Sequence, residues 1–100
     1  MEIKIENIAE QTIINIKGRI DTATSPEFEK AIAPVLAGDM KDVIIECKEF
    51  EYISSTGLRL FLVLQKTANA KKGHLIIRNM NDDIKNVFNM TGFTALFKFE

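Results

Sequence analysis

Several residue types that mark particular classes of protein are scarce in this chain of 100 residues. It has a single cysteine, Cys47, which cannot form a disulfide within the chain, so we expect a reducing, cytoplasmic environment. The longest apolar run near the centre, residues 60–64, is far shorter than the roughly 20 residues that span a bilayer. Residues 1–6 alternate apolar and charged side chains and lack the hydrophobic region of a signal peptide. We therefore expect no membrane insertion.

Charge of one sign and the usual catalytic motifs are also missing. The formal net charge is −1, and no basic stretch or stripe marks a nucleic-acid partner, so we expect no direct contact with nucleic acid. No glycine-rich phosphate-binding loop followed by Lys-Ser/Thr is present, and no serine stands in a Gly-x-Ser-x-Gly motif. Cys47 lies in an apolar segment and is expected in the core. The sequence predicts neither a metal site nor a cofactor.

The residues that are present predict one α/β domain covering residues 1–100. Hydrophobic residues make up 46% of the chain, enough for a single core without disulfides or metals. Alternation predicts an antiparallel hairpin of two strands at the start. Helical spacing and capping residues then predict three helices, which alternate with three further strands. This order favours a mixed, mostly parallel β-sheet. The predicted strands are 2–6, 12–17, 43–47, 75–77 and a final one within 93–99. The first predicted helix follows the N-cap Ser25, has Pro26 in its first position and ends before Gly38. The other predicted helices are 58–72 and one after residues 79–83 that ends at Gly92.

Three small hydroxyl residues and a glycine, Ser54, Ser55, Thr56 and Gly57, stand before the second predicted helix. Ser and Thr cap helix N-termini by accepting hydrogen bonds from the first free backbone N–H groups. A helix N-terminus is also a favourable place for an anion, so a serine held there would be a well-stabilised phosphoserine. One cap needs only one hydroxyl. The cluster therefore leaves both interpretations of Ser55 open.

Four segments together resemble the STAS domains of bacterial anti-sigma factor antagonists, over nearly the whole chain. Residues 18–21 match a Gly-x-Leu/Ile-Asp segment after the second strand, and residues 54–58 match the signature Asp-Ser-Ser/Thr-Gly-Leu. The aliphatic strand 43–47 matches loosely, and residues 91–93 repeat the Thr-Gly-Phe of the family's end. Two positions depart from the pattern: Ser54 replaces the aspartate of the signature, and Arg59 stands where small residues are common.

The resemblance implies a function that the residues alone do not give. Ser55 occupies the position of the family's phosphorylated serine. The implied partners are an anti-sigma factor that is a serine kinase and a serine phosphatase that removes the phosphate. The unphosphorylated antagonist binds the anti-sigma factor and so frees a sigma factor for transcription. A STAS domain that is not phosphorylated, serving as an interaction subunit of a transporter or stress-signalling complex, is the alternative.

A partner surface is expected around Ser55. The loop after the second strand and the start of the second helix should meet at one end of the sheet, where binding sites of open α/β sheets gather. Asp21 has two interpretations: a residue of a local turn or cap, or a loop acid that positions the hydroxyl or the kinase. The predicted partner-binding residues are Asp21, Thr22, Ser54, Thr56, Gly57 and Arg59.

An enzyme is the main alternative of another class, with Ser55 as a hydrolase nucleophile. Such a serine needs a base within hydrogen-bonding reach. The only histidine is His74, which opens the predicted strand after Gly73. We therefore expect a binding module and not an enzyme.

Overall fold

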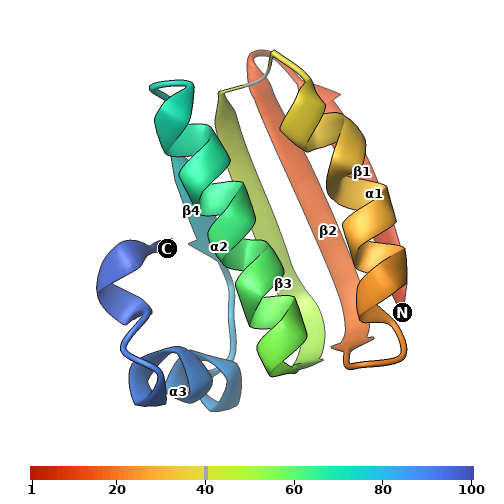
Figure 1. Ribbon diagram of the computed structural model, residues 1–100, viewed down its shortest axis with the longest axis vertical. Helices are drawn as coiled ribbons and strands as arrows, with labels where there is room; N and C mark the ends of the chain where they lie inside the picture. The colour runs from red at the N-terminus through yellow and green to blue at the C-terminus, as the bar shows by residue number, and fades with distance from the viewer. Residues whose placement is uncertain (40) are drawn as a thin grey trace.

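The computed structural model describes residues 1–39 and 41–100. In these residues five strands form one sheet in the order β1-β2-β3-β4-β5, and the helices lie between strands along the chain (Figure 1). This arrangement confirms the predicted α/β class and the order of elements. The elements are β1 (Glu2–Ile8), β2 (Gln11–Ile20), α1 (Ser25–Ala37), β3 (Asp42–Ile53), α2 (Ser55–Ala70), β4 (Leu75–Arg78), α3 (Asp82–Met90), the 3-10 helix η1 (Thr94–Leu96) and β5 (Lys98–Phe99).

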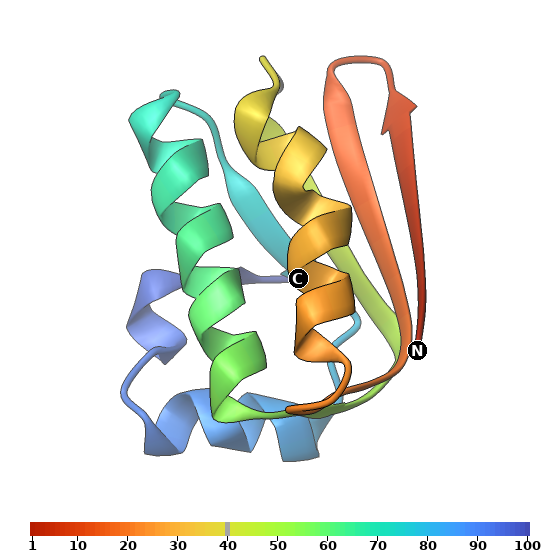
Figure 2. The same ribbon diagram turned by 45° about the vertical axis from the view of Figure 1, so that its right-hand side comes forward.

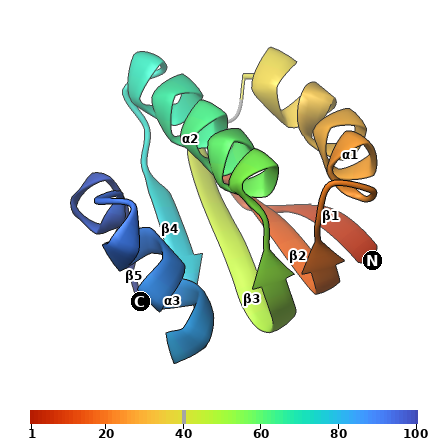
Figure 3. The ribbon, with the colours of Figure 1, turned by 60° about the horizontal axis from the view of Figure 1, so that its bottom comes forward.

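The sheet opens with the predicted antiparallel hairpin and continues in parallel. β1 pairs antiparallel with β2, while β2–β3, β3–β4 and β4–β5 are all parallel pairs. Helices α1 and α2 lie side by side on one face of the sheet (Figures 1 and 3). Their apolar stripes meet the inward side chains of the strands, as the alternation of the strand residues requires. The other face carries polar and charged side chains around a row of three isoleucines, Ile13, Ile44 and Ile76, and no helix of the described residues covers it.

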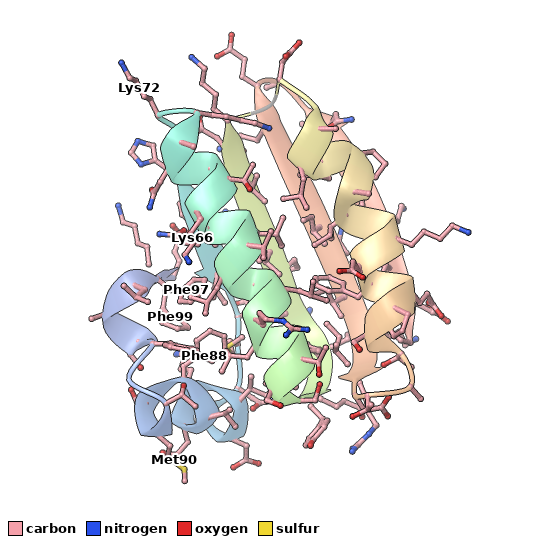
Figure 4. The ribbon with its side chains drawn as sticks, in the orientation of Figure 1. Lys66, Lys72, Phe88, Met90, Phe97 and Phe99 are labelled. Atoms are coloured by element: carbon pink, nitrogen blue, oxygen red, sulfur yellow. The ribbon has the colours of Figure 1, made fainter. Side chains whose placement is uncertain are left out.

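Phe61 of α2 is the centre of the core. Its ring centroid lies 5.8 Å from that of Phe28, 6.0 Å from that of Phe50 and 6.0 Å from that of Phe88. Phe88 in turn contacts Phe97 and Phe99, and these three rings gather beside α2 (Figure 4). The aromatic side chains therefore join α1, β3, α2, α3 and the C-terminal segment into one core.

Several predicted boundaries are wrong, each for a local reason. β2 continues past Gly18 to Ile20. Gly18 adopts a φ of +96°, and the pairing with β3 continues beyond it with a shifted register. β3 runs on to Ile53, since Phe50 is buried although its neighbours are charged. The N-cap of α1 is Thr24 and not Ser25, because the Thr24 carbonyl already accepts from Phe28 N at 3.1 Å.

The end of α1 is held by Lys71, the residue that directly follows α2. Pro34 lies inside α1, yet the helix continues to Ala37. The ammonium group of Lys71 donates to the carbonyl oxygens of Val35, Leu36 and Gly38 at 3.3, 3.2 and 2.5 Å. A cation placed on the free carbonyls of a helix C-terminus complements the helix dipole. Lys71 therefore fixes α1 to the end of α2.

Candidate functional site

The ends of β2 and β3 bring the two predicted parts of the site together. Ile20 pairs with Ile53, and the backbone N–H of Ser54 donates to the Ile20 carbonyl at 2.8 Å. The β2–α1 and β3–α2 connections consequently leave the same end of the sheet (Figure 3). Asp21 and Ser55 both lie at this end, as the sequence predicted for them.

Ser54, and not Ser55, caps helix α2. Its hydroxyl oxygen accepts a hydrogen bond from Gly57 N at 3.2 Å, and its carbonyl accepts from Leu58 N at 2.9 Å. Its backbone is extended, as an N-cap residue requires. Aspartate and serine are about equally good N-caps. The replacement of the family's aspartate by Ser54 therefore keeps the capping hydrogen bond.

Ser55 is the first residue of α2, and its side chain is exposed. Its hydroxyl makes no hydrogen bond to any residue that the structure describes. The backbone N–H groups of Ser55 and Thr56 likewise find no acceptor within residues 1–39 and 41–100. With the positive end of the helix dipole, these N–H groups form an environment that favours negative charge. Thr56 is half-buried, so Ser55 is the most accessible hydroxyl of the cluster.

Gly57 lets the first turn of α2 approach the strand ends closely. It is buried, and a Cβ atom at this position would lie 2.7 Å from Cγ2 of Ile20 and 3.0 Å from Cγ1 of Ile53. Both distances are too short for carbon atoms in contact. Gly57 therefore acts on the site through packing, and its predicted contact with a partner stays a prediction.

Asp21 organises the loop between β2 and α1. One oxygen of its carboxylate accepts from Ala23 N at 3.0 Å and from Thr24 N at 2.9 Å, and Asp21 N donates to the Thr24 hydroxyl oxygen at 2.9 Å. Hydrogen bonds from Thr24, first the backbone N–H and then the hydroxyl, lower the pKa of Asp21. This geometry favours the turn interpretation of Asp21. Thr22 and Arg59 are both exposed, Thr22 in this loop and Arg59 in the first turns of α2.

Two further residues at this end of the sheet were not predicted from the sequence. Arg19 and Tyr52 are a register pair of β2 and β3, and the guanidinium carbon of Arg19 lies 4.3 Å from the centre of the Tyr52 ring. Such a cation–π contact orders both side chains, although both are exposed. The available signal was alternation: Arg19 and Tyr52 precede Ile20 and Ile53, whose side chains point inward.

The remaining reactive residues lie away from Ser55. His74 N donates to the carboxylate of Asp42 at 3.0 Å, and Asp42 begins β3, whereas Ser55 follows the end of that strand. A Ser–His pair is therefore not made. Cys47 is buried, and burial in the core raises the pKa of its thiol, which stays protonated. Within the described residues no cluster of three or more His, Cys, Asp or Glu side chains is arranged to hold a metal ion.

Comparison with known proteins identifies the family. The sequence model of the STAS domain family matches residues 2–100. The chain belongs to the STAS family. A curated STAS relative, the anti-sigma-B factor antagonist of Staphylococcus aureus strain NCTC 8325, is 30% identical over 98 residues, covering 96% of this chain and 91% of that protein.

Solved structures of anti-sigma factor antagonists have the same STAS fold. Unphosphorylated SpoIIAA superimposes with a TM-score of 0.83 at 18% identity, covering 99% of this chain and 88% of that one. The phosphorylated form of SpoIIAA from Bacillus gives 0.76 at 18% identity, covering 99% and 91%. At these identities the likeness establishes the fold alone. No helix in the described part of this STAS domain is both long and apolar enough to cross a membrane.

Proposed function

We propose that this STAS domain is an anti-sigma factor antagonist whose binding to an anti-sigma factor kinase is switched by phosphorylation of Ser55. The observation that carries the proposal is the division of labour at the start of α2. Ser54 supplies the cap, and Ser55 beside it presents an accessible hydroxyl at the helix N-terminus. The relative in Staphylococcus aureus, an anti-sigma-B factor antagonist, supports the same role. The role is one of the cytoplasm, where transcription takes place.

The domain can accept a phosphate on Ser55 without rearrangement. A phosphoserine adds about −1.5 to −2 charges and three strong hydrogen-bond acceptors. The N–H groups of Ser55 and Thr56 and the helix dipole stabilise this charge locally. Directly below, Leu58 and Phe61 are packed into the core, so the helix cannot shift without losing that packing. The phosphate therefore changes the surface and leaves the fold in place.

The same phosphate is unfavourable for a partner already docked on this end of the sheet. A charge buried at an interface without a partner group costs on the order of 2–5 kcal/mol, which corresponds to a loss of affinity of about 30-fold or more. We assign two exposed residues near Ser55 to the partner surface. Thr22 lies in the β2–α1 loop, and Arg59 lies in α2. We also assign the half-buried Asp21, Ser54 and Thr56 to this surface. A serine phosphatase would return the protein to its binding form.

The proposal is tested by incubating the protein with its cognate anti-sigma factor kinase and ATP and then mapping the modified peptide. We expect one phosphate, on Ser55. Ser55→Ala should abolish the modification, while the neighbouring hydroxyl variant Thr56→Ala should still be phosphorylated. Modification of Thr56 or Ser25 with Ser55 untouched would contradict the assignment. Unmodified protein that still binds an assembly partner would favour the alternative role, that of an interaction subunit.

A further inference from the structure

The two edges of the sheet differ in how open they are to another chain. On one side the sheet ends in β5, which has only two residues. On the other side it ends in β1, with seven residues, which forms the outer border of the molecule in Figure 2. β1 contains no proline, and its pairing with β2 runs without a register shift from Glu2–Lys17 to Ile8–Gln11. A long, regular edge strand of this kind is a template for pairing with a further strand.

Charged side chains usually discourage such pairing, but in β1 their effect depends on the register. Glu2, Lys4 and Glu6 alternate in sign along the face of the sheet that the helices do not cover. Suppose that β1 of a second copy pairs antiparallel with β1 of the first, about a twofold axis normal to the sheet. Residues that lie opposite each other in the two β1 strands then point to the same face of the joined sheet. A register centred on Ile5 pairs all seven residues and places Lys4 opposite Glu6 twice. A register centred on Lys4 instead sets the two ammonium groups together and Glu2 against Glu6, which is unfavourable.

The helix-covered face of β1 also fits this register. Ile3 and Ile5 are only partly buried. Beside Ile5 a shallow groove of about 430 Å³ extends to Ala31, Pro34 and Val35 of α1. In the register centred on Ile5, the two Ile5 side chains lie opposite each other and cover the mouth of this groove in each copy. The register centred on Lys4 would also bring apolar side chains together, because it sets Ile3 opposite Ile5. The charges on the other face therefore select the alignment, and the helix-covered face is compatible with it.

We propose that two copies of this chain associate through antiparallel pairing of their β1 strands about Ile5, which joins the two sheets edge to edge. The contact involves a single strand and the flank of α1, so it buries less than the roughly 1,200 Å² of a standard interface and gives a weak, reversible dimer. Ser55 follows β3, two strands away from this edge. The dimer leaves the end of the sheet that carries Ser55 open.

Sedimentation equilibrium of the full chain, from micromolar to millimolar concentration, measures the association. Lys4→Glu places two carboxylate pairs across the axis, and Glu6→Lys places two ammonium pairs there. Each variant should weaken the dimer by about tenfold or more. The double variant K4E/E6K restores opposite charges and should return association to the wild-type level. A mixture of K4E and E6K should form heterodimers more strongly than either variant forms homodimers.

Lys66→Glu is the matched control, because it changes the net charge as K4E does but lies on α2 (Figure 4). K66E should dimerise like the wild type. Thermal unfolding of E6K checks the monomer, since Glu6 also accepts a hydrogen bond from the side chain of Asn15 at 3.0 Å. Wild-type protein that remains monomeric at millimolar concentration would overturn the proposal. So would a double variant as weak as the single ones, or a K66E variant as weak as K4E.

Discussion

Replacing Ser54 and Ser55 one at a time should separate the capping hydroxyl from the regulatory one. Ser54→Ala removes the acceptor for Gly57 N, a hydrogen bond of 3.2 Å at a half-buried position. Loss of a serine N-cap costs about 1 kcal/mol, with a range of roughly 0.5–2 kcal/mol. In a domain of about this size, 1 kcal/mol lowers the melting temperature by about 4–8 °C. Ser55→Ala removes an exposed hydroxyl that caps nothing, so its cost should stay within about 0.5 kcal/mol.

Thermal unfolding followed by circular dichroism measures both variants under the same conditions. Ser54→Asp is the control, since aspartate caps as well as serine does, and it should unfold close to the wild-type temperature. Equal destabilisation by Ser54→Ala and Ser55→Ala would refute this division of roles. The same conclusion would follow if Ser54→Asp were as unstable as Ser54→Ala.

Three further substitutions test contacts that hold the site in place. Gly57→Ala should destabilise the fold by about 1–3 kcal/mol in urea unfolding, because its Cβ meets Cγ2 of Ile20 at 2.7 Å. If that clash is the cause, the loss of unfolding free energy should be smaller when the same substitution is made in an Ile20→Ala background. Lys71→Met should lower the urea midpoint by an amount equivalent to about 1 kcal/mol or more, since three carbonyl oxygens at the end of α1 lose their donor. An unchanged midpoint would contradict this role of Lys71. Asp21 has a lowered pKa in the folded state, so its carboxylate stabilises the fold at neutral pH and this contribution is lost as the pH falls through that pKa. Asp21→Asn should therefore be less stable than the wild type at neutral pH, and melting curves should show the difference narrowing on acidification; a gap that does not depend on pH would refute the role of the carboxylate.

The order of elements could be predicted because local patterns and tertiary packing agree. In β1 and β2 alternating isoleucines mark the face that meets the helices, and Ile14 and Ile16 are indeed buried. The ends of strands were less predictable. Residues 48–51 are mostly charged, yet Phe50 among them is buried and stacks on Phe61. That contact comes from α2 and is not visible in the local sequence.

The site was predicted as a region, but not in its division of roles. Which of three adjacent hydroxyls caps a helix depends on where the backbone turns helical, and that is set by the bond from Ser54 N to the Ile20 carbonyl. The same contact explains Gly57, whose missing Cβ makes room for Ile20. The contact between Arg19 and Tyr52 depends on a register shift at Gly18, which local patterns do not specify.

The most direct test of the proposed switch is the affinity of the anti-sigma factor kinase for the two forms of this protein. Isothermal titration calorimetry with unmodified and Ser55-phosphorylated protein should give a Kd at least about tenfold weaker for the phosphorylated form. Amide NMR spectra of the two free forms should differ mainly over residues 54–59 and the loop at Asp21. Equal affinities would contradict the switch. A weaker Kd accompanied by shifts throughout α3 would contradict the surface mechanism and indicate a conformational change.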